Sequence, residues 1–126
     1  HYFIFGHLEP ERFAAALQSA NLVLSRAGSS ALFEIAASGK PAIVVPIPED
    51  LSRDQRQNAY SYARSTGAIV LEEHNLSDDI LVAEIERILK NPEVEKEMSV
   101  GARSLTVENA AYTLADTLRS IAREHE

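Results

Sequence analysis

Four short runs of branched and aromatic apolar residues recur along the chain, and polar residues do not alternate within them. The runs are Tyr2–Phe5, Leu22–Leu24, Ala42–Val45 and Ala68–Leu71. Continuous apolar runs of this length are typical of strands that are covered on both faces. Because the segments between them carry helical periodicity, we predict an α/β fold with a parallel sheet of about four strands.

The spacing of apolar residues predicts the helices between and after these strands. We expect helices over about residues 10–20, 30–38, 54–65 and 77–91. Beyond Pro92 the pattern indicates a short helix and then a longer one, with no further strand. We therefore expect a helical C-terminal tail that packs either on this sheet or on a neighbouring domain.

Length and charge restrict the class of protein. The 126 residues fit one domain, residues 1–126, and the net charge of -7 disfavours a broad surface for nucleic acid or anionic lipid. The chain has no cysteine and no apolar stretch of the ~20 residues that span a bilayer, so we expect a cytoplasmic protein. It begins at His1 and enters an apolar run at once, so we expect it to be part of a longer protein.

The segment Arg26–Ser30 joins a predicted strand to a predicted helix through small residues. In a parallel sheet, ligands collect beyond the carboxyl ends of the strands, and free N–H groups at a helix start favour a phosphate. The small residues of this segment, among them Gly28, Ser29 and Ser30, would let such a ligand approach the backbone, and Arg26 adds a positive charge. Small residues also suit a tight turn that binds nothing, and that alternative stays open.

Glu34 lies one helical turn beyond this segment. If Ser30 caps the helix, Glu34 is one residue too late to complete a capping box. Its carboxylate is placed to accept hydrogen bonds from a vicinal diol such as a ribose. The alternative is an acid that is merely solvated or that interacts with the helix dipole.

Gln55 and Asn58 follow the loop after the third apolar run and share one helix face. Ser52 to Gln55 fits a capping box, in which the Gln55 amide satisfies the helix start. Asn58 is a poor residue for a helix interior, so it indicates either a buried hydrogen bond to the neighbouring loop or a ligand contact.

The sequence lacks the motifs expected for a metal site, for nucleotide hydrolysis or for a serine esterase. The four histidines (His1, His7, His74 and His125) share no metal-ligand spacing, so we predict no metal site. There is no phosphate-binding Walker loop and no G-x-S-x-G elbow, which disfavours nucleotide hydrolysis and serine-esterase activity.

Several segments together resemble one known family. They are residues 24–30 (LSRAGSS), 34–41 (EIAASGKP), 45–46 (VP), 54–55 (DQ) and 58–59 (NA). In order and spacing they are similar to the C-terminal domain of family 28 glycosyltransferases. The resemblance implies part of a GT-B enzyme, in which two Rossmann-like domains face a cleft and the C-terminal domain holds a nucleotide-sugar donor.

The resemblance also implies an activity and a set of donor-binding residues. Members of the family transfer a hexose such as N-acetylglucosamine from a UDP-sugar to a lipid-linked acceptor in peptidoglycan precursor synthesis, with inversion and without an essential metal or cofactor. Glu34 would bind the ribose, residues 28–31 would face the diphosphate, and Arg26 would support that loop. Gln55, and with it Asn58, would contact the sugar, and His7–Leu8 would correspond to the segment that contacts uracil.

The same resemblance implies that other parts are needed. The family's acceptor domain, with its general base, is absent from these residues, as is its glycine-rich G-G-S loop. We therefore predict no catalytic residue here and expect an upstream acceptor domain or a partner subunit, with membrane contact only through that missing part at the inner face of the membrane.

Three alternatives remain open at this point. The chain could be a non-catalytic donor-binding subunit, as in the dolichol-linked chitobiose synthase. It could belong to another GT-B enzyme, such as a glycolipid synthase or a nucleotide-sugar epimerase. It could also be a truncated globule that forms a homodimer through an exposed sheet edge.

Overall fold

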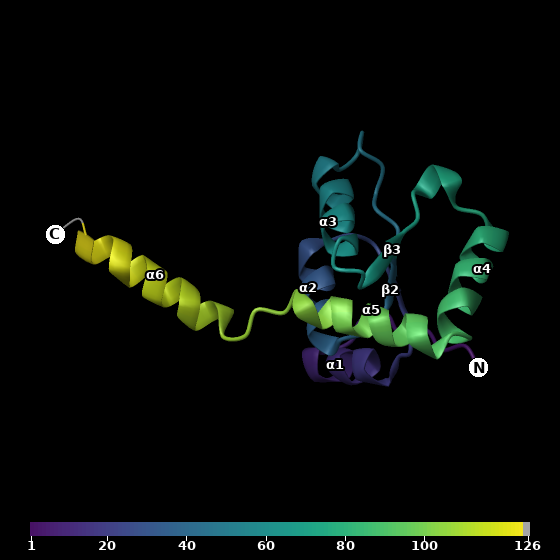
Figure 1. The fold of residues 1–126 in the computed structure, drawn as a ribbon, viewed down its shortest axis with the longest axis horizontal. Helices are drawn as coiled ribbons and strands as arrows, with labels where there is room; N and C mark the ends of the chain where they lie inside the picture. Colours follow the sequence, from purple (N-terminus) through teal and green to yellow (C-terminus); the bar gives the residue numbers. More distant parts are fainter. Residues whose placement is uncertain (125–126) are drawn as a thin grey trace.

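The computed structural model describes residues 1–124, apart from the side chain of Arg53, and shows strands and helices in alternation (Figure 1). Within these residues the sheet has three strands: β1 (Val23–Ser25), β2 (Ala42–Val44) and β3 (Ala68–Val70). They are parallel and lie in the order β1-β2-β3, with Ile43 at the centre between Leu24 and Ile69. The predicted α/β fold with a parallel sheet and flanking helices is confirmed.

The helices begin and end within a few residues of the predicted bounds. They are α1 (Pro10–Ser19), α2 (Ser29–Ser38), α3 (Arg53–Ala63), α4 (Asp78–Leu89), α5 (Pro92–Ser104) and α6 (Ala110–Glu124), with a short 3-10 turn, η1 (Glu73–Asn75). Gly39 ends α2 in the left-handed conformation, with φ of 65°. The Ser77 hydroxyl caps α4 by accepting a hydrogen bond from the Ile80 amide at 3.3 Å.

The prediction of a first strand at Tyr2–Phe5 is wrong. This segment forms no strand, and its four side chains are 64–88% exposed. A strand needs a neighbouring backbone to pair with, and among the described residues β1 pairs with β2 alone. An apolar run gives the tendency to form a strand, but it does not supply that neighbour.

The central strand β2 is buried on both faces, whereas Leu24 of β1 is 53% exposed. On one face, Val44 packs with Ile35 of α2 and with Ala59 of α3. On the other face, Ile43 packs with Ile88 of α4 and with Met98 of α5. Side chains of successive strand residues point to opposite faces, which explains why Ile43 and Val44 belong to different clusters.

Helix α5 packs closely against the turn that leads into β3. A Cβ added at Gly67 would lie 2.6 Å from the Ala102 amide nitrogen, and one added at Gly101 would collide with the Ser65 carbonyl oxygen. Glycine at both positions therefore lets the two backbones touch. The preceding residue, Thr66, takes a positive φ of 67°.

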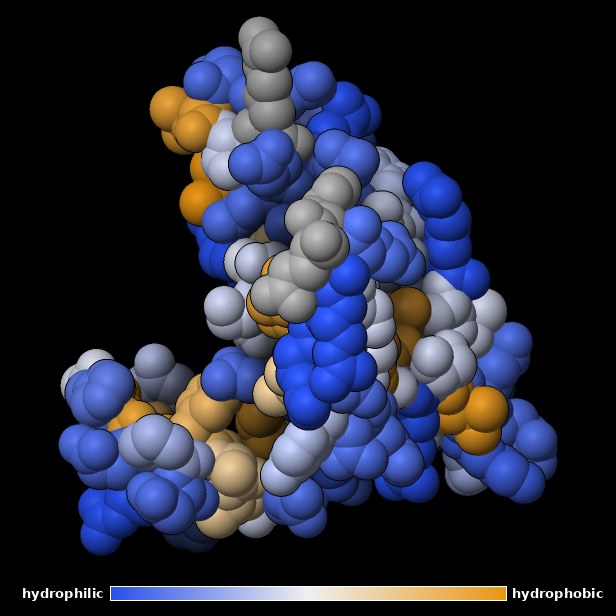
Figure 2. Space-filling model, turned by 90° about the vertical axis from the view of Figure 1, so that its left-hand side faces the viewer, coloured by the Kyte–Doolittle hydropathy of each residue, from blue (hydrophilic) through white to orange (hydrophobic). Residues whose placement is uncertain are grey.

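Helix α6 projects away from the rest of the molecule (Figure 1), and all its described residues are exposed. Of the predicted helical tail, α5 therefore packs on the sheet, and α6 does not. Viewed from the side of α6, the apolar surface is divided into patches with hydrophilic side chains between them (Figure 2). No described helix is both long enough and apolar enough to cross a membrane.

Candidate functional site

Three loops meet at the carboxyl edge of the sheet, where a ligand of a parallel α/β sheet is expected. They follow β1 (residues 26–28), β2 (residues 45–52) and β3 (residues 71–77). The side chains of Arg26 and Glu73, with Leu24, Val45 and Leu76, line a cleft of about 300 Å³ at this edge. Helix α2 begins at Ser29, three residues after Arg26.

Helix α2 begins at Ser29, one residue earlier than predicted, and its N-cap lies two residues earlier than predicted. Gly28, not Ser30, is the N-cap, because its carbonyl oxygen accepts the first intrahelical hydrogen bond from Leu32, at 3.0 Å. Gly28 has no side chain to cap the helix. The N–H groups of Ser29, Ser30 and Ala31 make no hydrogen bond to any described residue, so they and the helix dipole are available to an anion.

Arg26 extends from this loop across the edge of the sheet. Its Nη1 forms an ion pair with Glu73 of η1 and donates to the Val45 carbonyl oxygen at 3.4 Å. Both charged side chains are about half exposed, 52% for Arg26 and 45% for Glu73. Arg26 therefore joins all three loops and is accessible from solvent.

Gln55 does not form the predicted capping box. Ser52 is the N-cap of α3 without a side-chain hydrogen bond, and the Gln55 Oε1 instead accepts hydrogen bonds from Ala27 N at 3.2 Å and Ile47 N at 3.3 Å. The same side chain thus joins the loops after β1 and β2. Spacing within one helix could not reveal it, because the partner lies 28 residues away.

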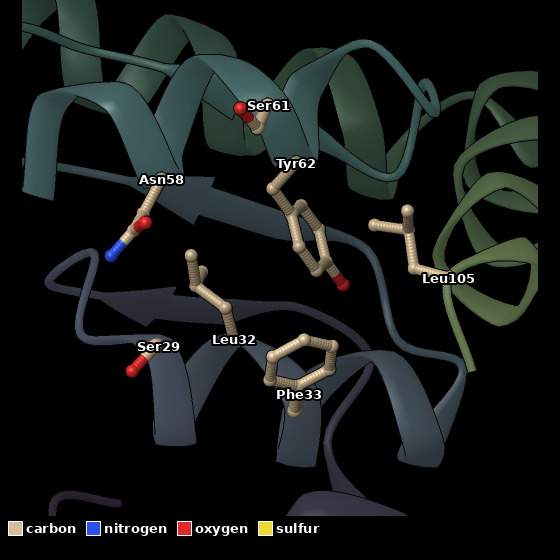
Figure 3. Close-up of a pocket in the computed structure, with 7 residues that line it drawn as sticks. All are labelled: Ser29, Leu32, Phe33, Asn58, Ser61, Tyr62 and Leu105. Atoms are coloured by element: carbon tan, nitrogen blue, oxygen red, sulfur yellow. The ribbon is translucent and has the colours of Figure 1, made fainter. Parts of the chain in front are cut away.

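Asn58 makes the hydrogen bond to the neighbouring loop that its position in a helix indicated. Its Nδ2 donates to the Ala27 carbonyl oxygen at 3.3 Å. Figure 3 shows Asn58 pointing from α3 toward the loop that precedes Ser29. Ala27, which is fully buried, is therefore held through both its N–H and its C=O.

Glu34 lies on the opposite side of α2 from α3. It lines a groove of about 240 Å³ with Pro10, Phe13 and Leu17 of α1. Its carboxylate is exposed and forms no ion pair with a described residue. Because Ser30 precedes Glu34 by four residues, the two share one face of α2.

The structure thus brings Arg26, Gln55 and Asn58 together around Ala27, and places Glu34 separately on the α1 side. Ser29 lies on the α3 side and lines a cavity of about 140 Å³ with Leu32 and Phe33 of α2, three residues of α3, and Leu105 (Figure 3). The candidate residues therefore surround the first turn of α2 rather than lie on one wall of a pocket.

The acidic residues after β3 were not predicted from the sequence as part of the site. Glu73 pairs with Arg26, and Glu72 accepts hydrogen bonds from Arg56 at 3.0 Å and from Tyr60 at 2.8 Å. Partial burial raises the pKa of Glu72, but the hydrogen bonds from Tyr60 and Arg56, together with the charges of Arg56 and His74, outweigh it and lower the pKa overall. The signal was available, since these acids follow a strand end at the edge where the loops meet.

No group of three or more potential metal-binding side chains is close enough to hold an ion within the part of the chain that the structure describes. His1, His7 and His74 lie among the described residues, and His125 lies outside them.

This fold and this edge define a class of proteins. Residues 10–118 match the glycosyltransferase family 28 C-terminal domain, so the chain belongs to that family. The resemblance inferred from the segments around Arg26, Glu34 and Gln55 is confirmed.

Individual proteins that are similar to this chain support the same family. The chain is 40% identical over 110 residues to the UDP-N-acetylglucosamine–N-acetylmuramyl-(pentapeptide) pyrophosphoryl-undecaprenol N-acetylglucosamine transferase of Phenylobacterium zucineum, covering 87% of this chain and 30% of that protein. It is also 40% identical over 111 residues to the enzyme of the same name from Mesorhizobium japonicum, covering 88% of this chain and 30% of the relative. The crystal structure of Acinetobacter baumannii MurG matches 87% of this chain and 31% of its own, with a TM-score of 0.76 and 28% identity. The chain therefore spans about 30% of the length of the curated relatives it matches.

Proposed function

We propose that this chain binds the UDP-sugar donor, UDP-N-acetylglucosamine, of a family 28 hexosyltransferase that acts on a lipid-linked acceptor. The observation that carries the proposal is the start of α2, where three consecutive N–H groups lack a partner among the described residues. A diphosphate would accept hydrogen bonds from them, with the Arg26 guanidinium nearby. The names of the relatives, each a transferase of N-acetylglucosamine from a UDP donor, support the choice of ligand.

The chemistry supported by this edge is that of the leaving group. When the bond between the sugar and the diphosphate breaks, negative charge grows on the diphosphate oxygens. Fixed N–H dipoles and a guanidinium placed there stabilise that charge more than the ground state, which lowers the barrier. Deprotonation of the acceptor hydroxyl would come from a further domain or a partner chain.

Glu34 supplies the test of the nucleoside part of the proposal. Its carboxylate would accept hydrogen bonds from both ribose hydroxyls, so Glu34→Ala should weaken UDP binding by about tenfold to a hundredfold, the effect of losing hydrogen bonds to a charged group. Isothermal titration of the chain with UDP, UDP-N-acetylglucosamine and ADP measures this. The wild-type chain should prefer the two uridine nucleotides.

A nucleotide without the ribose hydroxyls provides the control. Glu34→Ala should bind 2′,3′-dideoxy-UDP as well as the wild type does, because the missing carboxylate has nothing to contact. Glu86→Ala, which removes an exposed acid of α4 that pairs with Lys90, should change neither titration. Equal UDP affinity of Glu34→Ala and the wild type would contradict the proposed ribose contact.

A further inference from the structure

The side-chain amides of Gln55 and Asn58 both form hydrogen bonds with the backbone of Ala27. Gln55 accepts a hydrogen bond from the Ala27 N–H, and Asn58 donates one to the Ala27 C=O. Both side chains are partly buried and come from α3, which the core holds through Ala59 and Tyr62. Ala27 immediately precedes Gly28, the residue that caps α2.

We infer that Gln55 and Asn58 are positioning residues, which hold the peptides on either side of Ala27 so that the N–H groups at the start of α2 stay aimed at the anion. This inference rests on the proposed function for the identity of the anion. Gly28 cannot fix the helix start with a side chain of its own, and a glycine N-cap leaves the backbone free to move. The two amides of α3 supply that restraint from outside the loop.

The hydrogen bonds also limit what Gln55 can offer to a ligand. Its Oε1 is occupied by two backbone N–H groups, at 3.2 Å from Ala27 and 3.3 Å from Ile47. Its Nε2 makes no hydrogen bond to a described residue. Gln55 can therefore meet a ligand only as a donor, to a lone pair of a hydroxyl or phosphate oxygen.

The positioning role predicts a selective loss of affinity. In Asn58→Ala the Ala27 carbonyl loses its partner, the α2 start gains freedom, and UDP should bind about fivefold to tenfold more weakly, as expected for one hydrogen bond. Uridine, which has no diphosphate to meet those N–H groups, should bind with unchanged affinity when titrated by NMR. A general loss of structure would weaken both ligands.

Two further variants keep the test independent of folding. Asn58→Asp has the same shape but cannot donate, so it should reproduce the selective loss. Gln57→Ala removes an exposed neighbouring amide of α3 and should bind both ligands like the wild type. Equal weakening of UDP and uridine in Asn58→Ala, or no weakening of either, would overturn the inference.

Amide hydrogen exchange separates this inference from the proposed function. Gln55→Glu keeps an oxygen that can accept from Ala27 and Ile47, so their amides should stay protected, whereas Gln55→Met should expose both to faster exchange. That result does not depend on any nucleotide. If the wild type binds no UDP while these exchange rates change as stated, the proposed function fails and the restraint on the loop stands; unchanged exchange in Gln55→Met would overturn the restraint itself.

Discussion

At the scale of single residues, buried polar atoms show which contacts this fold requires. The Gln55 carbonyl and the Asn58 amide are each satisfied by backbone groups. The Tyr62 hydroxyl is different, because it is buried between α2 and Leu105 and has no hydrogen-bond partner among the described residues. Burial raises its pKa from 10.0 to about 12.

Replacing Tyr62 with Phe should therefore not destabilise the chain. Removing a buried hydroxyl that lacks a partner costs no hydrogen bond, so the free energy of unfolding should stay the same or rise by up to about 1 kcal/mol. Urea titration at pH 7 measures this. Tyr62→Ala, which leaves a cavity, should instead lose about 3 kcal/mol. A clear loss of stability in Tyr62→Phe would show that the hydroxyl has a partner.

The raised pKa of Tyr62 predicts that Tyr62→Phe also changes how stability depends on pH in alkaline solution. Between pH 10 and about 12 the unfolded chain releases the Tyr62 proton while the folded chain keeps it, so stability falls as the pH rises through this window. Below pH 10 both states are protonated and the group has no effect. Tyr62→Phe should lack this part of the decline, measured as the difference between the two stability profiles.

The sequence located the candidate residues more reliably than their contacts. Asn58 was unusual for its place in a helix, and that local anomaly correctly indicated a buried hydrogen bond. Gln55 fitted a local capping pattern, yet its partners are Ala27 and Ile47. A residue pattern within one helix indicates only hydrogen bonds within that helix. It therefore could not predict the hydrogen bonds that Gln55 accepts from Ala27 and Ile47.

At the scale of elements, periodicity predicted the α-helices α1 to α6, because each carries an apolar stripe. In α1 to α4 that stripe packs into one of the two core clusters, and α5 contributes to both. The prediction of a strand at Tyr2–Phe5 failed for a different reason. A strand forms only where a second strand pairs with it, and that partner can lie far away in the sequence. The close packing of α5 against the turn before β3 could not be predicted from the apolar spacing either. It depends on Gly67 and Gly101, which meet only after the chain has folded.

Gly101 provides the test of that contact. An added methyl group would collide with the Ser65 carbonyl oxygen and crowd the Gly67 nitrogen, at 2.7 Å, so Gly101→Ala must push α5 away from β3. We expect a loss of about 2–3 kcal/mol, in the range of overpacked sites. Thermal unfolding measures it. Gly6→Ala is the matched control, because nothing lies within 4 Å of the added atom, and it should unfold like the wild type.

At the scale of the whole molecule, the compact part ends with α5. Helix α6 presents Leu114, Leu118 and Ile121 on an apolar stripe, and these side chains are 47–61% exposed. None of its described residues is buried. The sheet and the candidate site are therefore held together without it.

Truncation after Asn109 should accordingly leave the fold intact. The free energy of unfolding should change by less than about 0.5 kcal/mol, as for exposed positions in general. UDP affinity should also be unchanged, because α6 lies away from the first turn of α2 (Figure 1). Urea unfolding and titration of the shortened chain check both. A large loss of stability would mean that α6 contacts the body in solution.

The position of α5 has a consequence for how a protein of this family can diversify. Its second half touches Gly39 and Gly67, which precede β2 and β3, so it closes the amino ends of the strands. The candidate donor residues follow the opposite ends. Replacements in the loops after β2 and β3 can then change the candidate site without disturbing the contacts of α5 at the other end of the sheet, so the site and the stability of the fold can evolve separately.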